Sequence, residues 1–187
     1  WQRQMWIRDS KKVVRNGVSQ EVVEAPDLYE LPALKCWPKD GGHFLTLPLV
    51  RTLAPSTGRS NLGVYRMQIY DRDETGMHWQ IQKGGGFHYA EAEAANEALE
   101  VAVILGGDPV LQLAAILPLP ESMEELLFAA ILRGAPTPMT QAKSLRMTVP
   151  ANAEFVLEGS VAPRVRQTEG PFGDHFGHYS HAAEFRY

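Results

Sequence analysis

The chain has 187 residues, and 18 Lys and Arg against 22 Asp and Glu give it a formal net charge of −4. Its 44% apolar and 21% charged residues are typical of a globular domain, which excludes a disordered or fibrous chain. The negative net charge argues against a protein that binds nucleic acid by neutralising phosphates.

Membrane and disulfide-rich classes are also disfavoured. No apolar run approaches the roughly 20 residues that span a bilayer, because Pro118 and Pro120 break the longest one. Arg3 and Arg8 interrupt any signal-peptide core at the N-terminus. The single cysteine, Cys36, excludes an internal disulfide or a cysteine-based metal site. These features predict a cytoplasmic protein without a transmembrane segment.

Residues 1–40 are expected to be an irregular lead-in, the end of a preceding region, because the chain begins at Trp1 rather than Met. From residue 43 the pattern is that of strands, with β-branched and aromatic residues in partial alternation. Strands are predicted at 43–50 and 62–70 around a loop at 51–60. A turn at 71–76 then leads to a strand at 77–82, which the glycines at 84–86 end.

The middle of the chain is helical. An Ala- and Glu-rich helix is predicted at 87–99, and the apolar run at 101–106 predicts a strand buried on both faces. Asp108 and Pro109 are typical of the first positions of a helix, here extending to Leu117. A second helix is predicted at 121–132, ending at Gly134, followed by strands at 143–149 and 154–161. The order predicts an α+β fold.

The tail at 169–180 is rich in glycine, acidic residues and histidine. Glu169 and Asp174 lie five residues apart around Gly170, Pro171 and Gly173. Two carboxylates held close together repel, so the pKa of one could rise and make it a general acid. A solvated turn with acidic decoration explains the same residues equally well.

Three other segments carry polar groups that could bind a ligand. Arg66 lies within a β-forming run and must face solvent or meet an anion. Lys83 and the following glycines could bind a phosphate, although a flexible turn has the same composition. Glu121, Glu124 and Glu125 suit the first turn of a helix, and a metal role would need a further oxygen ligand.

Taken together, six ordered segments resemble the UbiD family of reversible decarboxylases over residues 41–179. They are NLGVYRMQ (61–68), GMHWQIQKGG (76–85), VILGGDP (103–109), PLPESMEE (118–125), VPANAEFVLEG (149–159) and EGPFGDHFGHY (169–179). The resemblance implies that residues 41–187 form a flavin-binding split β-barrel with flanking helices.

The resemblance also implies an activity and its cofactors. The chain would be a carboxy-lyase for the non-oxidative decarboxylation of an aromatic or α,β-unsaturated carboxylic acid. It would use prenylated FMN, supplied by a flavin prenyltransferase, with Mn²⁺ and in some relatives K⁺ at the phosphate. A homo-oligomer or a complex with a partner subunit is expected.

Site residues carry over position by position. The catalytic network would be Arg66, Glu169 and Asp174, with Asp174 as proton donor after Glu169 and burial raise its pKa. Asn61 and Glu125 would bind the metal. The cofactor would contact Val64, Tyr65, Arg66, His78, Trp79, Gln80, Lys83 and Gly84.

Two departures leave alternatives open. Gln82 stands where some relatives have a histidine near the metal, and the family's large C-terminal domain does not follow Tyr187. The chain could therefore be a non-catalytic flavin-binding or assembly subunit that needs a partner. An ordinary FMN oxidoreductase fits a split barrel as well, but gives the acidic loop no role.

Overall fold

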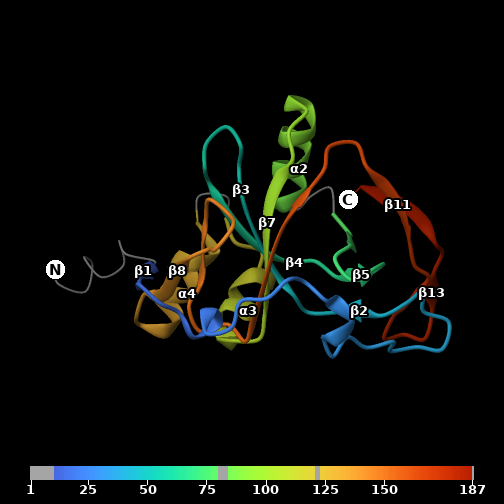
Figure 1. The fold of residues 1–187 in the computed structure, drawn as a ribbon, viewed down its shortest axis with the longest axis horizontal. Helices are drawn as coiled ribbons and strands as arrows, with labels where there is room; N and C mark the ends of the chain where they lie inside the picture. The colour runs from blue at the N-terminus through green and yellow to red at the C-terminus, as the bar shows by residue number, and fades with distance from the viewer. Residues whose placement is uncertain (1–10, 80–83, 121–122, 187) are drawn as a thin grey trace.

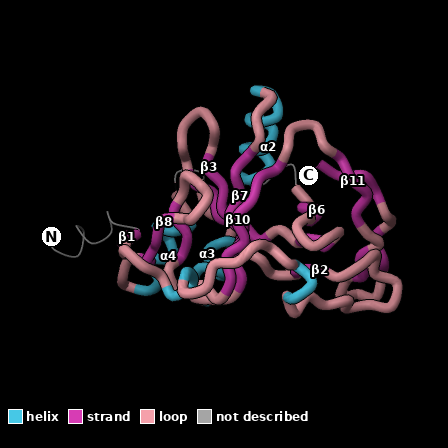
Figure 2. Tube along the Cα trace, in the orientation of Figure 1, coloured by secondary structure: helices cyan, strands magenta, loops and turns pink. Residues whose placement is uncertain are grey.

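A four-stranded antiparallel sheet with strand order β10–β7–β3–β4 forms the centre of the structure (Figure 1). The structure is a computed structural model that describes residues 11–79, 84–120 and 123–186. The strands of this central sheet are β3 (Leu49–Leu53), β4 (Ser60–Val64), β7 (Leu99–Leu105) and β10 (Phe155–Val161). Helices and short strands cover it, giving the α+β architecture that the sequence predicts (Figure 2).

The central strand β7 is buried on both faces of the sheet. Val101 and Val103 point into one hydrophobic cluster, whereas Ala102 and Ile104 point into another. Successive side chains of a strand face opposite sides, so a strand buried on both faces must be apolar throughout. The prediction of such a strand in this part of the sequence is confirmed.

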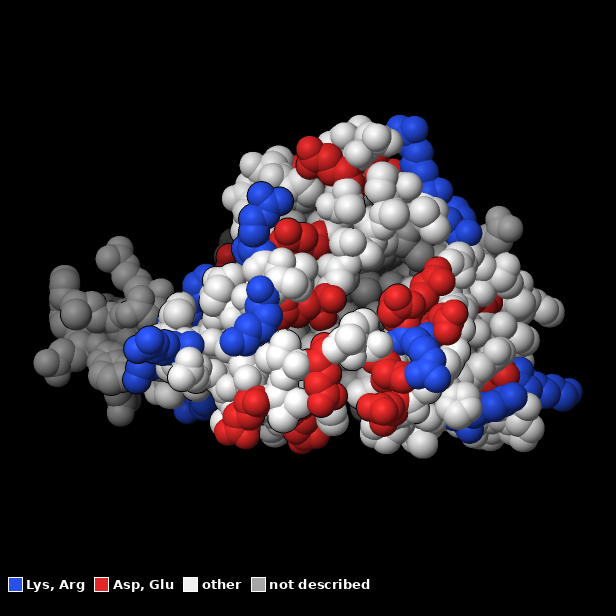
Figure 3. Space-filling model, in the orientation of Figure 1, with Lys and Arg blue, Asp and Glu red and all other residues white. Residues whose placement is uncertain are grey.

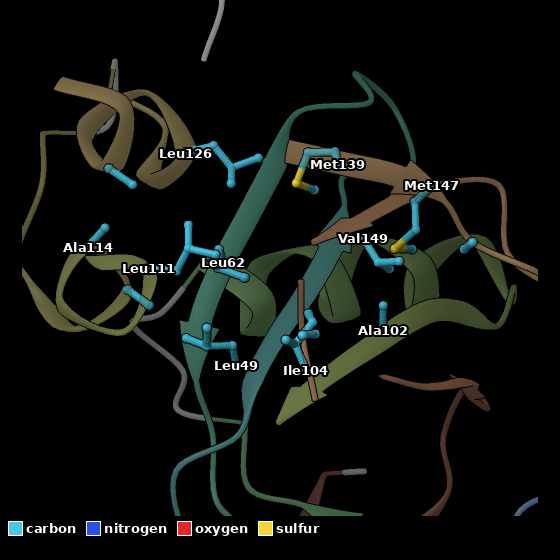
Figure 4. Close-up of a cluster of buried hydrophobic side chains, with 14 of the residues drawn as sticks. Leu49, Leu62, Ala102, Ile104, Leu111, Ala114, Leu126, Met139, Met147 and Val149 are labelled. Atoms are coloured by element: carbon cyan, nitrogen blue, oxygen red, sulfur yellow. The ribbon is translucent and has the colours of Figure 1, made fainter. Parts of the chain in front are cut away.

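Helices α3 (Pro109–Ile116) and α4 (Glu125–Arg133) cover one face of the sheet (Figure 4). Leu111 and Leu126 from these helices meet Leu49 and Leu62 from the sheet. The Asp108 side chain accepts a hydrogen bond from the Val110 N–H at 2.8 Å, and Gly134 ends α4 with φ +73°. Both helix-end signals read from the sequence are therefore confirmed, although α4 begins later than predicted, with Glu124 as its N-cap.

Helix α2 (Gly84–Ala95) and the strands β5 (Met67–Ile69) and β6 (Thr75–Met77) enclose the second cluster, on the other face. The glycines at 84–86 form the first turn of α2 rather than a turn that ends a strand. The helix ends at Ala95, short of the predicted end, because Leu99 already belongs to β7. The predicted strand at 77–82 has only Met77 in β6, and Gln80 to Lys83 lie outside the described residues.

Smaller sheets complete the fold. Figure 1 shows β11 and β13 at one side of the molecule, across from β1 and β8. The sheets are β1–β8–β9, β2–β5–β6, β11–β14 and β12–β13. Their remaining elements are β1 (Lys11–Val13), β2 (Phe44–Leu45), β8 (Thr137–Gln141), β9 (Thr148–Pro150), β11 (Arg166–Glu169), β12 (Phe172–Gly173), β13 (Tyr179–Ser180) and β14 (Ala183–Arg186), with 3₁₀ helices at Val18–Gln20 and Leu28–Glu30.

Several predicted strand boundaries are wrong. The segment at 43–50 is split by Pro48 into β2 and the start of β3, and the predicted loop at 51–60 begins with three residues of β3. Arg51 there is only 2% exposed, and two of its guanidinium nitrogens have no hydrogen-bond partner. Most of the predicted strand at 143–149 is the turn between β8 and β9. Turn formers and apolar residues mark both of these segments, so composition could not separate strand from turn.

Most described residues before Asp40 are exposed, but two points in this segment contact the rest of the chain. Val13 pairs with Met139 in a parallel β1–β8 ladder, and Leu28 is 4% exposed within the second cluster. In the described part of the chain, no helix has the length and apolar character needed to cross a membrane.

Candidate active site

An ion pair joins the partly exposed Arg66 to the buried Glu169, 103 positions further along the sequence. Glu169 Oε1 accepts a hydrogen bond from Arg66 Nε at 2.8 Å, and Oε2 accepts one from Arg66 Nη2 at 3.1 Å. This bidentate geometry matches the planar guanidinium to the planar carboxylate. Of the two outcomes that the sequence allowed for Arg66, the structure shows pairing with an anion.

His78 completes the cluster around Glu169. Its Nδ1 lies 2.8 Å from Glu169 Oε2, and the Glu169 side chain is 0% exposed. Arg66 follows β4, His78 follows β6 and Glu169 ends β11, so three elements bring the groups together. The His78 N–H donates to the Arg66 carbonyl at 3.4 Å, which places the two residues side by side at the end of the β5–β6 pair.

The charge on Glu169 depends on this cluster. Burial alone raises the pKa of the carboxyl, but hydrogen bonds from His78 and Arg66, with their charges, outweigh it and the pKa is lowered. The expectation that one of the two tail carboxyls has a raised pKa is therefore wrong for Glu169.

This lowered pKa predicts how stability depends on pH. A carboxyl whose folded pKa lies below its unfolded value stabilises the fold above the unfolded value, about pH 4–5, and loses this contribution as pH falls through the folded pKa. We expect Glu169→Gln to lower the unfolding free energy at neutral pH and to converge on the unchanged protein in acid. Urea unfolding at a series of pH values measures this difference. The exposed Glu97→Gln is the control, and an equal deficit for Glu169→Gln at every pH would contradict the linkage.

Asp174 does not join this cluster in the structure. Its Oδ1 accepts hydrogen bonds from the backbone N–H groups of Phe176 and His178, each at 2.9 Å. The His178 N–H, followed by that of Phe176, lowers the pKa of Asp174, and burial does not compensate. Within the described residues no hydrogen bond links it to Glu169. The predicted raised pKa is therefore wrong, because the turn at Gly177, with φ +83°, brings N–H groups to the carboxylate instead.

Asn61 and Glu125 both lie at β4, the outer strand of the central sheet. Asn61 lies in β4, is 8% exposed and has an Nδ2 atom without a hydrogen-bond partner. Glu125 begins α4, and its Oε2 accepts a hydrogen bond from the N–H of Leu62, the next residue after Asn61. Burial raises the pKa of Glu125. The structure thus brings the two predicted metal ligands to the same point of β4.

The N-terminus of α2 reaches the same place. A Cβ atom on Gly84 would lie 2.2 Å from Asn61 Oδ1, so only glycine allows this approach. The next residue, Gly85, donates its N–H to the Tyr65 hydroxyl at 3.0 Å. The first N–H groups of a helix bind anions, whereas an amide oxygen with a carboxylate suits a hard divalent cation. These donors fit a metal-bridged phosphate.

Other predicted cofactor contacts lie deeper. Trp79 is 6% exposed, with its ring 5.0 Å from that of Tyr65 and stacked at 6.1 Å on that of Tyr89. Its Nε1 atom has no hydrogen-bond partner.

Val64 is half-buried against the first hydrophobic cluster. Gln80 and Lys83, and with them Gln82, lie outside the described residues. No group of three or more His, Cys, Asp or Glu suited to a metal occurs among residues 11–79, 84–120 and 123–186.

A cavity of about 580 Å³ lies elsewhere. Met67 and Met77, a cross-strand pair, line it, and none of the predicted site residues does. Glu24, Asp73 and Glu158 contribute acidic groups to its wall. Figure 3 shows acidic side chains around a hollow in one face of the molecule. The cavity and the Glu169 cluster therefore have different linings.

Two polar residues that the sequence analysis assigned no role hold the acidic loop. Gln68 Oε1 accepts a hydrogen bond from the Gly170 N–H at 2.9 Å, and Asp40 Oδ1 accepts one from the Gly173 N–H at 2.8 Å. Gln68 belongs to the motif that contains Arg66, so its position two residues along was the available signal. Nothing in the sequence around Asp40 pointed to the loop.

The described residues thus contain an Arg66–Glu169 ion pair and, at β4, the Asn61 amide against the first residue of α2. The sequence model of the 3-octaprenyl-4-hydroxybenzoate carboxy-lyase Rift-related domain of the UbiD family matches residues 11–187. The chain belongs to this family.

Two relatives in sequence match this chain over 85% of its length. A protein of Chlamydia pneumoniae that is named as one of the subunits of 4-hydroxybenzoate decarboxylase is 48% identical over 159 residues, which are 85% of this chain and 27% of the relative. An uncharacterised protein of Chlamydia caviae is 51% identical over 85% of this chain and 27% of its own length. The chain thus spans about a quarter of these relatives.

Among solved structures, vanillic acid decarboxylase of Sedimentibacter hydroxybenzoicus in its closed form matches with a TM-score of 0.90 and 30% identity, over 98% of this chain and 41% of that one. The UbiD-class enzyme HmfF of Pelotomaculum thermopropionicum in complex with FMN gives a TM-score of 0.87 at 27% identity, over 98% and 42%. An evolved dimeric form of HmfF, in complex with prenylated FMN, gives 0.85 at 27%, over 94% and 42%.

Proposed function

We propose that this chain is the flavin-binding part of a reversible decarboxylase that acts on an aromatic or α,β-unsaturated carboxylic acid with prenylated FMN and Mn²⁺. The observation that carries the proposal is the fully buried Glu169, which Arg66 holds in a bidentate pair within a chain of the UbiD family. We also propose that the sheets around the second hydrophobic cluster form the split barrel that the resemblance implies.

Asn61 and Glu125 would hold the metal, and the first N–H groups of α2 would face the phosphate. The Asn61 amide, which has a buried nitrogen without a partner, and the Gly84 backbone that approaches it fit such a group. When bound, prenylated FMN supplies the covalent chemistry that makes the substrate carboxylate a leaving group. The K⁺ that the family resemblance implies is also part of the proposal, and we assign it no ligands.

Arg66 would orient the substrate. It uses Nε and Nη2 for Glu169, and its Nη1 donates no hydrogen bond within the described residues, so this nitrogen is available to a substrate carboxylate. The Arg66 side chain is 25% exposed, and its guanidinium lies 4.2 Å from the centre of the Phe172 ring. The ring and Glu169 fix the direction of the guanidinium, which is the positioning that such a reaction requires.

Asp174 would deliver the proton that replaces CO₂. Its carboxylate first has to leave the N–H groups of Phe176 and His178, because the acid form is disfavoured while it accepts both. Glu169 is a poor donor for the same purpose, since its pKa is also lowered. The reaction therefore requires a rearrangement of the loop that carries Asp174.

Replacement of Asp174 tests this assignment. In the complete protein loaded with cofactor, we expect Asp174→Asn to lower the rate of decarboxylation about 10²–10⁴-fold, which is the contribution of a general acid. Flavin content should not change, because Asp174 contacts neither Asn61 nor Glu125. Rates of CO₂ release and the flavin absorbance of the purified protein measure both. Asp73→Asn, at an exposed position, is the control, and turnover by Asp174→Asn at the unchanged rate would exclude Asp174 as the donor.

One observation favours a second candidate, a flavin-binding subunit that works only with a partner. The Asp174 carboxylate is tied to its own loop by the N–H groups of Phe176 and His178. A partner that releases Asp174 would then be needed for turnover. Decarboxylation by the purified chain alone, with added cofactor, would exclude this candidate.

A further inference from the structure

The acidic loop from Glu169 to Asp174 is held along its length by polar contacts. Arg66 and His78 bind Glu169, and Gln68 accepts the Gly170 N–H. The Gly41 N–H donates to the Pro171 carbonyl at 2.8 Å. Asp40 makes the last of these contacts, with the N–H of Gly173, which is the residue before Asp174.

Asp40 is a buried carboxylate that joins two segments. It is 4% exposed, and each of its oxygens accepts one backbone N–H: Oδ2 from Trp37 and Oδ1 from Gly173, both at 2.8 Å. Hydrogen bonds to an ionised acceptor are among the strong ones, and a buried charge without them is unfavourable. Asp40 therefore ties the loop to the turn at Trp37.

The two segments also lie in close contact. A Cβ atom on Gly173 would lie 2.4 Å from Cδ1 of the Trp37 ring, and one on Gly41 would lie 2.1 Å from the Gly170 carbonyl oxygen. Only glycine fits at both positions. The Asp40 carboxylate therefore contacts the loop within a closely packed interface, one residue before Asp174.

We propose that Asp40 is a positioning residue that fixes the backbone of the acidic loop at Gly173 and thereby sets where Asp174 stands relative to Arg66 and Glu169. The proposal rests on the proposed function for its catalytic consequence. The anchoring itself does not depend on that function. Asp40 acts through the loop and contacts neither the substrate nor the cofactor.

Asp40→Asn is the sharpest test, because it keeps the shape of the side chain and removes one of the two acceptor oxygens. We expect backbone amides of residues 170–178 to exchange with solvent deuterium about tenfold faster, as the loss of one such hydrogen bond implies, while β3 and β7 keep their rates. In the complete, cofactor-loaded protein kcat should fall about 10–100-fold with KM and flavin content unchanged.

Asp27→Asn is the matched control, since the Asp27 side chain also accepts a backbone N–H, from Tyr29, without touching the loop. It should change neither loop exchange nor kcat. Unchanged exchange at 170–178 in Asp40→Asn, or faster exchange throughout the central sheet, would overturn the anchoring. Faster loop exchange with an unchanged kcat would overturn the positioning role. If the unchanged protein decarboxylates nothing, the proposed function fails, and the exchange data alone decide whether Asp40 anchors the loop.

Discussion

Arg66→Ala is expected to slow decarboxylation strongly and to destabilise the fold. The change leaves the fully buried Glu169 carboxylate with His78 as its remaining side-chain partner. Breaking a buried pair by removing one member costs about 3–5 kcal/mol, and we expect about 2–3 kcal/mol here because Arg66 is partly exposed and His78 stays. Misplacement of the reacting groups should lower the rate at least about 10²-fold. Chemical unfolding and CO₂ release measure the two effects.

Two further variants separate charge from geometry. Arg66→Lys keeps the positive charge but cannot form the bidentate pair, so it should recover part of the stability and little of the rate. Arg72→Ala removes an arginine whose side chain is 66% exposed and paired with Asp27, and it should cost less than about 1 kcal/mol. If Arg66→Ala and Arg72→Ala lower the unfolding free energy equally, burial of Glu169 does not add to the cost of losing its partner.

Retention of the cofactor should depend on Asn61 and Glu125. We expect Asn61→Ala and Glu125→Ala each to weaken binding of Mn²⁺ and of the flavin phosphate at least about 10–100-fold, the loss typical of disturbed metal sites. The reason is the loss of an oxygen ligand beside the α2 N-terminus. Metal analysis and flavin absorbance after gel filtration measure retention with and without added Mn²⁺.

The neighbouring Glu124→Ala is the matched control for this site. Glu124 stands one residue before Glu125, at the N-cap of α4, and its side chain makes no capping hydrogen bond. It should leave metal and flavin content unchanged. If Asn61→Ala and Glu125→Ala retain both as well as Glu124→Ala does, the metal assignment is wrong.

Local signals in the sequence predicted the centre of the fold well. Asp108 before Pro109 and the glycine at 134 marked helix ends, and the continuous apolar run around Val103 marked a strand with two buried faces. Residues that are close together in the sequence determine these features, so the sequence alone can reveal them. The strand β8 was missed because Thr137–Gln141 contains Pro138, whose pairing with β1 and β9 is set by distant segments.

The site needed contacts between distant segments. Composition allowed an exposed Arg66, and only the family resemblance connected it with Glu169; the structure shows the pair. The same resemblance named Asn61 and Glu125, which the structure brings to one point of β4. Residues with no motif of their own, such as Asp40, became visible only through their contacts.

The pKa of Asp174 shows why the spacing of the two carboxylates in sequence gave a wrong prediction. Glu169 and Asp174 are five positions apart in the sequence, and this suggested mutual repulsion. The loop instead turns so that each carboxylate meets its own hydrogen-bond donors, side chains for Glu169 and backbone N–H groups for Asp174. Both pKa values fall, because local donors matter more than distance along the chain.

The cofactor content of the protein, made together with a flavin prenyltransferase and supplied with Mn²⁺, tests the central claim most directly. Native mass spectrometry and the absorption spectrum should show one prenylated FMN per chain, lost when Mn²⁺ is removed. Protein that retains no flavin, or that binds unmodified FMN equally well with and without Mn²⁺, would contradict the account.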